Sequence, residues 1–215
     1  MIKPYFEDAK AGIVIYHGDC REILPGLGHF DLCLTDPPYG IGYQHDGSGR
    51  GKHSRRNSQA IIGDSGPFDP APLLAFPNVI LWGADHYANR LPEGRWLVWD
   101  KLDGLESFDS FSDVEIAWQN RKGASRIFRY LWKGICQAGE KEGGRPHPSL
   151  KPACLMGWCL TFVPEAKLVL DPYCGTGPVL EACKARGIAA VGIEIEERYA
   201  EIAARRLQQE VLPLA

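Results

Sequence analysis

The chain has 215 residues, of which 45% are hydrophobic and 24% are charged, and its formal net charge is −3. This length and composition predict one folded domain and exclude a wholly disordered chain. The net charge excludes a strongly polycationic nucleic-acid-binding protein, although local basic patches matter more than the total.

Segments that would direct the chain to a membrane or out of the cell are not recognisable. No apolar run approaches the ~20 residues that span a bilayer, and residues 1–12 lack the layout of a signal peptide. The seven cysteines form no CxxC pair and no zinc-like cluster with histidine. We interpret them as reduced thiols, and we expect a cytoplasmic protein without a membrane partner or a metal.

In the first half of the chain, apolar runs predict short strands separated by polar turns. Strands are expected at 11–17, 30–35, 78–82 and 95–99, with a helical turn at 22–27 and a helical link between the last two strands. Residues 113–118 and 125–132 are expected to pair as a hairpin across 119–124, where Gly123 favours a turn.

Two segments carry local positive charge. Residues 40–66 contain seven glycines and a basic group, which predicts a long functional loop. The basic residues of this loop are Arg50, Lys52, Arg55 and Arg56. Residues 121–133 contain five basic residues interleaved with aromatic ones. Each segment is either a solvated face or a surface that contacts DNA phosphates.

The second half predicts alternating helices and strands. Ser149 is expected to cap a helix at 152–163, followed by a strand at 167–170. A glycine turn then leads into a helix that starts with Pro178 and ends before Gly187. A strand at 189–195 and a helix at 196–210 follow, the helix turning Tyr199, Ile202, Ala203 and Leu207 inward. This order is a βαβα unit, so the sheet is at least partly parallel.

The motif LVLDPYCGTG at 168–177 is the sharpest local signal. A glycine turn after a strand lets the backbone approach a ligand closely, and Glu194 ends the next strand, where an acid can bind a ribose diol. The pattern is not GxGxxG, because Leu180 takes the last glycine position, and no GxxxxGK[ST] motif is present, which excludes a P-loop triphosphatase. A generic glycine turn remains an alternative.

The motif TDPPYG at 35–40 provides a rigid turn at a strand end, because two prolines fix the backbone and remove two donors. The Asp36 carboxylate, the Pro37 carbonyl and the Tyr39 ring together suit a flat group that carries an NH2. A purely structural Pro-Pro turn remains the alternative.

These two motifs, together with HPSLKP at 147–152, resemble the amino-DNA methyltransferases that use S-adenosylmethionine. The DPPY motif precedes DPYCGTG, which resembles the motif that binds the methyl donor. This order is that of the permuted class called beta, and the chain resembles its small, phage-like members. GDC at 18–20, RWLVWDK at 95–101 and GIEI at 192–195 also resemble family motifs, so the resemblance covers nearly the whole chain. Tyr173 and Cys174 replace residues that are more usual in the donor motif.

The resemblance implies an α/β, Rossmann-like fold with a mostly parallel seven-strand sheet and helices on both faces. It implies a single methyltransferase domain over 1–215, with a catalytic half at about 11–132 and a donor-binding half at about 147–210. A short target-recognition loop is expected at about 121–148.

Site residues are carried over from the same resemblance. The catalytic turn would be Asp36, Pro37, Pro38 and Tyr39. Glu194 would bind the donor's ribose, and Asp19 would accept from its adenine amine. The methionine end would be lined by Asp171, Tyr173, Cys174, Gly175 and Gly177, and Ser149 and Lys151 would frame the methionine carboxylate.

The expected reaction is methylation of adenine N6 in double-stranded DNA, with cytosine N4 as the alternative, since DPPY is more often linked to adenine. The chain contains no Pro-Cys dipeptide, which argues against methylation at carbon 5. An inactive nucleic-acid-binding relative and an enzyme acting on RNA bases or protein glutamine are the other readings. A homodimer stays open, and a restriction endonuclease would be a separate chain, because no nuclease motif is present.

Overall fold

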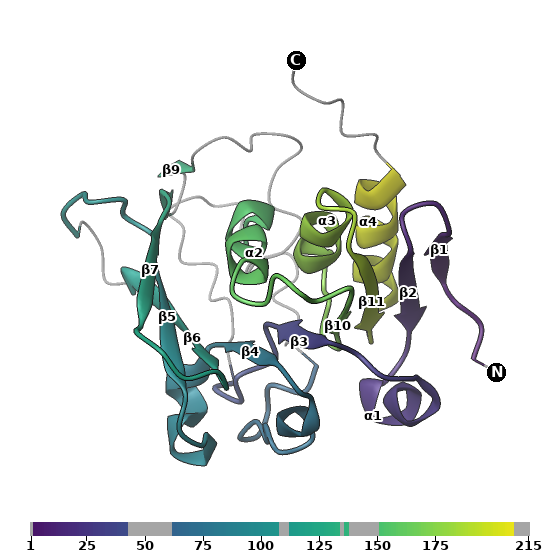
Figure 1. Cartoon of the computed structure of the whole chain (residues 1–215), viewed down its shortest axis with the longest axis horizontal. Helices are drawn as coiled ribbons and strands as arrows, with labels where there is room; N and C mark the ends of the chain where they lie inside the picture. Colours follow the sequence, from purple (N-terminus) through teal and green to yellow (C-terminus); the bar gives the residue numbers. More distant parts are fainter. Residues whose placement is uncertain (1, 43–61, 108–111, 134–135, 138–150, 209–215) are drawn as a thin grey trace, which may run out of the picture.

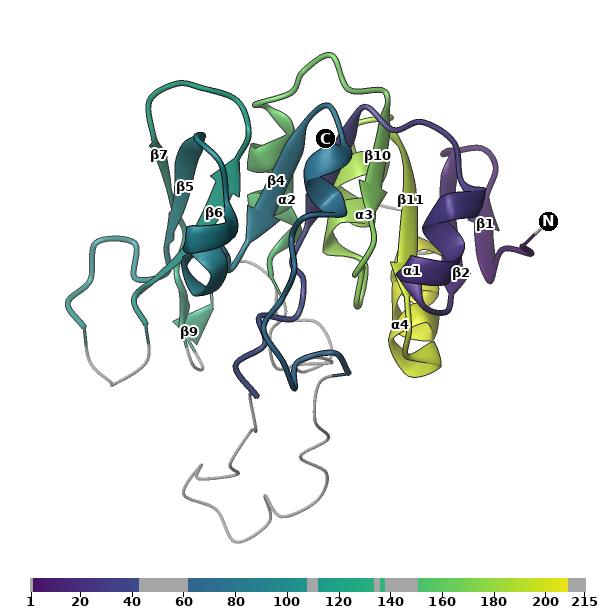
Figure 2. The same cartoon turned by 90° about the horizontal axis from the view of Figure 1, so that it is seen from below.

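A nine-stranded sheet runs through the computed structural model, which describes residues 2–42, 62–107, 112–133, 136–137 and 151–208. Figure 2 shows its strands side by side, from β7 at one end to β1 at the other. In spatial order they are β1 (Phe6–Asp8), β2 (Ile13–His17), β11 (Ala189–Glu194), β10 (Leu168–Asp171), β3 (Leu32–Thr35), β4 (Val79–Trp82), β6 (Val114–Gln119), β5 (Arg95–Asp100) and β7 (Arg126–Arg129). A separate pair is formed by β8 (Trp132–Lys133) and β9 (Cys136–Gln137).

The middle of the sheet is parallel. The strands β2, β11, β10, β3 and β4 pair in parallel with one another. On either side of this group, β1 pairs antiparallel with β2 and β6 pairs antiparallel with β4. Strands β3 and β4 are buried at every position, as expected for strands covered on both faces. The predicted α/β class and the parallel β10–β11 pairing are confirmed, and the sheet has nine strands where seven were expected.

Helices cover both faces of the sheet (Figure 1). On one face lie α2 (Ala153–Leu160), α3 (Pro178–Lys184) and α4 (Glu197–Gln208). On the other lie α1 (Cys20–Ile23) and the 3-10 helices η1 (Leu24–Gly26), η2 (Leu73–Ala75) and η3 (Ala84–Arg90). Each face therefore has its own apolar core, one around Leu155 and Met156 and the other around Leu81 and Trp118.

Small side chains let α4 approach the sheet closely. Its buried residues are Ala200, Ala203, Ala204 and Leu207, and a Cβ on Gly177 would lie 3.1 Å from the Ala203 Cβ. Tyr199 and Ile202, predicted to face inward, are only half-buried. The predicted cap Ser149 lies outside the described residues, and α2 begins after Pro152 without a side-chain cap.

The hairpin predicted from residues 113–118 and 125–132 is wrong. Strand β5 lies between β6 and β7, pairing antiparallel with β6 and parallel with β7. Insertion between β4 and β5 buries Ala117 and Trp118 of β6. The mostly exposed β7, with Arg126 and Arg129, suits the sheet edge, where charge discourages further pairing.

Residues 43–61 of the first predicted loop, which include Arg50, Lys52, Arg55 and Arg56, lie outside the described residues, as do residues 134–135 and 138–148 of the second. Within 121–133, Arg121 contacts the Asn78 Oδ1 at 2.6 Å and Glu165, so this arginine ties neighbouring segments together. In the described ranges, no helix combines the length and the apolar character that crossing a membrane would require.

Candidate active site

The carboxyl ends of four parallel strands meet at one edge of the sheet. Asp19 follows β2, Glu194 ends β11, Asp171 ends β10 and Asp36 follows β3. Two hydrogen bonds join neighbouring ends directly: the Gly18 N–H donates to the Glu194 carbonyl at 2.9 Å, and the Thr35 hydroxyl donates to Asp171 at 2.6 Å. Sheet pairing thus brings together the acidic residues that the motifs singled out.

Two segments bind the Glu194 carboxylate, the turn after β10 and the residues directly after β11. Its two oxygens accept the backbone N–H groups of Gly175 and Glu196, each at 2.8 Å, and only 8% of Glu194 is exposed. Burial raises the pKa of Glu194, while the two N–H donors oppose this change. Gly175 has a positive φ of 52°, and a Cβ built on it would meet no atom within 4 Å, so the backbone here faces open space.

Asp171 is the most deeply buried of these acids, with 2% of its surface exposed. It accepts the Thr35 hydroxyl and the Tyr173 N–H, the latter at 3.2 Å. Burial raises the pKa of Asp171 to about 7, and Thr35 and the Tyr173 N–H only partly offset this rise. Its carboxyl group is therefore near half-protonation at neutral pH.

The other residues that were predicted to bind the methyl donor make contacts within the protein. Cys174 is buried, and its N–H donates to the Ile193 carbonyl at 2.9 Å. The Tyr173 ring meets Phe68 edge-on at 6.0 Å. Asp19 caps α1 by accepting the Arg21 N–H at 2.9 Å and also binds the Arg21 guanidinium, which lowers the pKa of Asp19. The Asp19 carboxylate thus serves the fold here.

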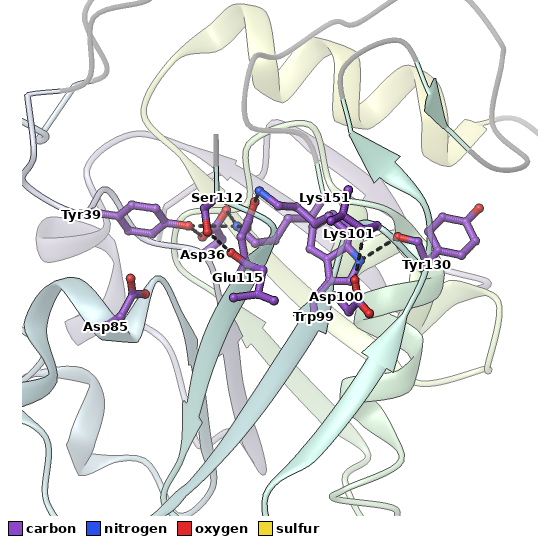
Figure 3. A network of polar contacts seen from close by, with 12 residues as sticks. Asp36, Tyr39, Asp85, Trp99, Asp100, Lys101, Ser112, Glu115, Tyr130 and Lys151 are labelled. Atoms are coloured by element: carbon purple, nitrogen blue, oxygen red, sulfur yellow. Dashed lines mark hydrogen bonds and ion pairs between the residues drawn. The ribbon is translucent and has the colours of Figure 1, made fainter. Parts of the chain in front are cut away.

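The catalytic turn that was predicted at Asp36–Tyr39 is held by side chains from distant segments (Figure 3). The Tyr39 hydroxyl donates to the Asp36 Oδ1 at 2.5 Å, and the Lys151 ammonium binds the Asp36 Oδ2. The Tyr39 ring stacks on His86 with centroids 4.9 Å apart. A Cβ on Gly83 would lie only 1.9 Å from the Tyr39 ring, so this glycine, with φ of 66°, makes room for the tyrosine.

Asp64 fixes the backbone directly after this turn. Its carboxylate accepts the N–H groups of Gly40 at 2.6 Å and Ile41 at 3.2 Å, and its carbonyl accepts that of Gly42 at 2.9 Å. Asp64 is 3% exposed. A Cβ on Gly40 would lie 2.2 Å from the Gly66 carbonyl oxygen, so the two chain segments that flank residues 43–61 approach closely here.

Lys151 occupies the centre of the polar network in Figure 3, with 3% of its side chain exposed. Besides Asp36, its Nζ contacts the Tyr39 hydroxyl at 3.0 Å and Glu115 at 3.1 Å, and Lys101 reaches Glu115 at 3.3 Å. Burial would lower the pKa of Lys151, but Asp36 and Glu115 raise it overall. This ammonium contacts the predicted catalytic turn, and its expected place at the methionine carboxylate stays a prediction.

Burial acts on the two carboxylates of this network in the same direction but with different outcomes. It raises the pKa of Asp36, where Lys151 opposes the rise and the negative charge of Glu115 adds to it. For Glu115 the nearby charges of Lys151 and Lys101 outweigh burial, and its pKa is lowered. Glu115 is accordingly ionised at neutral pH.

A sequence model of the N6/N4 DNA methylase family matches residues 78–205, more than half of the chain. The chain belongs to this family. The methylase is 24% identical over 99% of its length to the Type II methyltransferase M.ScaI of Streptomyces caespitosus, of which it covers 86%. It is also 24% identical over 97% of its length to M2.LlaDCHI of Lactococcus lactis, of which it covers 93%.

Solved structures share the fold of this methylase. A crystal structure of the M1.HpyAVI–SAM complex superimposes with a TM-score of 0.57 at 21% identity, covering 92% of this chain and 100% of the other. The cytosine-N4-specific PvuII DNA methyltransferase superimposes with a TM-score of 0.61 at 12% identity, covering 98% and 90%. At these identities the likeness concerns the fold alone.

Sequence reasoning missed three residues of the site: Asp64, His86 and Glu115. Asp64 lies in a glycine-rich loop where an aspartate is typical of any turn, and His86 lies in the helical link after β4. Glu115 alternates with apolar residues in β6, as a solvent-facing residue of a strand would. None belongs to a motif, and only the three-dimensional contacts identify them. Ser149 lies outside the described residues.

Removing the Asp64 carboxylate should destabilise the methylase. In Asp64→Ala two hydrogen bonds are lost, from the N–H groups of the half-buried Gly40 and the exposed Ile41, and we expect the free energy of unfolding to fall by about 1–3 kcal/mol. Asp64→Asn keeps one acceptor oxygen and should lose less. Urea denaturation measures both, and Asp69→Ala, at an exposed turn that accepts one N–H, is the control. Equal effects at positions 64 and 69 would contradict the proposed role.

Asp171 should make stability depend on pH. Its folded pKa of about 7 lies above the unfolded value, which is about 3.9. Between these values the folded carboxyl group retains a proton that the unfolded chain releases, so the free energy of unfolding decreases as pH rises. Asp171→Asn keeps an oxygen that accepts the Thr35 hydroxyl, but its side chain does not titrate, so this contribution to the pH dependence of stability disappears. We expect the variant to be more stable than wild type at pH 8, by up to about 4 kcal/mol, and equally stable near pH 4.

Chemical denaturation across this pH range measures the difference for Asp171→Asn. Glu7→Gln, at an exposed position of β1, is the control and should follow the wild-type curve. A difference between Asp171→Asn and wild type that does not change with pH would show that Asp171 does not titrate in this window.

Proposed function

We propose that this DNA methylase transfers a methyl group from S-adenosylmethionine to the exocyclic N6 amine of adenine in double-stranded DNA. The observation that supports this most is the position of Asp36 beside the end of the Asp171 strand, with the Glu194 strand next to it on the far side. Direct methyl transfer requires the site that binds the target amine and the turn that binds the methyl donor to lie close together, as they would at one edge of the sheet.

The residues around the glycine turn fit the donor. Each Glu194 oxygen accepts one backbone N–H and keeps a further lone pair for a ribose hydroxyl. The open space at Gly175 admits a ligand against the backbone. Bound S-adenosylmethionine supplies an electrophilic methyl group on a positively charged sulfur. Asp171, Tyr173, Cys174 and Gly177 would lie along its methionine end, with Asp19 near its adenine and Ser149 near its carboxylate.

The acceptor chemistry follows from the Asp36–Tyr39 turn. An exocyclic amine is a weak nucleophile, because its lone pair is delocalised into the ring. The Asp36 carboxylate and the Pro37 carbonyl would accept its two hydrogens, favour a pyramidal nitrogen and stabilise the positive charge that develops on it. Tyr39 and Lys151 use one lone pair on each Asp36 oxygen, so further acceptor capacity remains. The bond from the methyl carbon to sulfur breaks as the bond to the amine nitrogen forms, so S-adenosylhomocysteine leaves, and the methylated nitrogen then releases one proton to water. The sulfonium donor is already activated, so the reaction needs no metal.

Adenine is proposed because Asp36 opens the DPPY motif, and the target base must leave the duplex to reach it. Stacking on Tyr39 would stabilise the extruded base. Duplex DNA is the expected partner, and the exposed Arg126 and Arg129 of the β7 edge are candidates for phosphate contacts. We expect the enzyme to act in the cytoplasm as the modification half of a restriction–modification pair, since the curated relatives are Type II methyltransferases.

The acceptor is identified by methylating DNA with radiolabelled donor, digesting it and separating the nucleosides by mass spectrometry. Wild type should yield N6-methyladenine, and Asp36→Ala should yield no product while it still binds the donor, because the amine loses its charged acceptor. RNA and protein offered in parallel should stay unlabelled. N4-methylcytosine would overturn the choice of base, and full activity in Asp36→Ala would overturn the mechanism.

Donor binding should depend on Glu194. In Glu194→Ala the ribose hydroxyls lose their acceptor, and we expect binding of S-adenosylmethionine to weaken by about 1–3 kcal/mol. Isothermal calorimetry measures the change. Glu201→Ala, on the exposed side of α4, is the control and should bind as wild type does. Unchanged affinity in Glu194→Ala would remove this residue from the donor site.

A further inference from the structure

Four alternating charges converge on the catalytic turn from different elements. The Lys151 ammonium lies between the carboxylates of Asp36 and Glu115, and Lys101 contacts the far side of Glu115. Lys151 precedes α2, Glu115 lies in β6 and Lys101 follows β5. Of these side chains Lys151 is the most buried, at 3% exposure, whereas Asp36 and Glu115 are 23% and 31% exposed.

Stability alone is a weak reason for this arrangement, because desolvation of a buried ion pair offsets much of its attraction. The Lys151 Nζ also lies over the Trp82 ring, 5.7 Å from its centre, in a cation–π contact. Asp36 by itself would suffice to pair with Lys151. The presence of Glu115 as a second carboxylate on the same ammonium needs another explanation.

We propose that Glu115 is a positioning residue that sets the charge and orientation of Asp36 through Lys151. The proposal rests on the function proposed above, in which Asp36 accepts a hydrogen of the target amine. Lys151 opposes the rise that burial causes in the pKa of Asp36, and it binds one of the Asp36 oxygens. Glu115, held by Lys101, shares the ammonium, so Asp36 keeps enough negative charge to attract the amine as its nitrogen becomes positive.

The charges predict shifts of opposite sign in two variants. In Lys151→Met, Asp36 loses its cation and faces the negative charge of Glu115, so the pKa of Asp36 rises. In Glu115→Gln, the repulsion disappears while the Lys151 ammonium remains, so the pKa of Asp36 falls. The other titratable groups facing Lys151 or Asp36 are Tyr39, Tyr87, Lys101, Cys159 and Asp171, and they are unchanged in both variants.

The test is the pH profile of a single turnover, with enzyme in excess over DNA and saturating S-adenosylmethionine, from about pH 5 to about pH 9. We expect the acidic limb of the profile to move up by about 1–3 pH units in Lys151→Met, and to move down in Glu115→Gln, as expected for a charge a few ångströms away. Lys184→Met breaks another half-buried pair, Lys184 with Asp8 at 2.9 Å, and should leave the limb in place.

A second measurement does not depend on activity. Carbon-13 NMR of the Asp36 carboxyl group, in protein free of DNA, should show the same opposite shifts in its titration. Glu115→Gln conserves shape and carries the test if Lys151→Met does not fold. Limbs that stay fixed, or that move in the same direction in both variants, would overturn the proposal. A wild-type enzyme without methyl transfer would instead refute the function on which it rests, and the NMR titration would still report on the charges.

Discussion

Parallel pairing of β2, β11, β10 and β3 is the constraint on which the site depends. Parallel strands end at the same edge of a sheet. The backbone pairing alone therefore brings residues that are far apart in the sequence close together, and no contact between their side chains is needed for this. The register aligns Glu194 with His17 and Asp171 with Gly192, which brings the donor turn next to the start of α1. The Thr35–Asp171 hydrogen bond then connects this edge to the catalytic turn.

Bringing several carboxylates to one edge has an electrostatic cost, and the structure meets it differently at each position. Glu194 is satisfied by backbone N–H groups. Asp171 has a neutral hydroxyl partner and a raised pKa, so part of its population is protonated. Of these three acids only Asp36 is paired with a buried cation, which fits the role proposed for it as the acceptor of an amine hydrogen. Three acids at one edge can therefore have three roles.

Local patterns predicted much of the donor half of the methylase. The apolar runs at β10 and β11, the glycine turn and Pro178 at the first turn of α3 all lie between residues 168 and 194, and the structure confirms them. The catalytic half was harder, because β6 inserts between β4 and β5 and no local pattern encodes that order. Two strands joined by a turn usually pair as a hairpin. Here β5 takes the position beside β6 that β7 would occupy in a hairpin.

Side-chain contacts in the catalytic half were hard to predict for a similar reason, because they join residues that are far apart in the sequence. Lys151 and Asp36 are 115 positions apart, and the HPSLKP motif that contains Lys151 does not specify its partner. Its position follows from packing: Lys151 precedes α2, α2 packs against α3, and α3 begins directly after Gly177 of the donor turn. The ammonium that holds Asp36 is thus anchored to the helix pair beside the donor turn. The placement of the two turns relative to each other therefore depends on this helix packing as well as on the sheet.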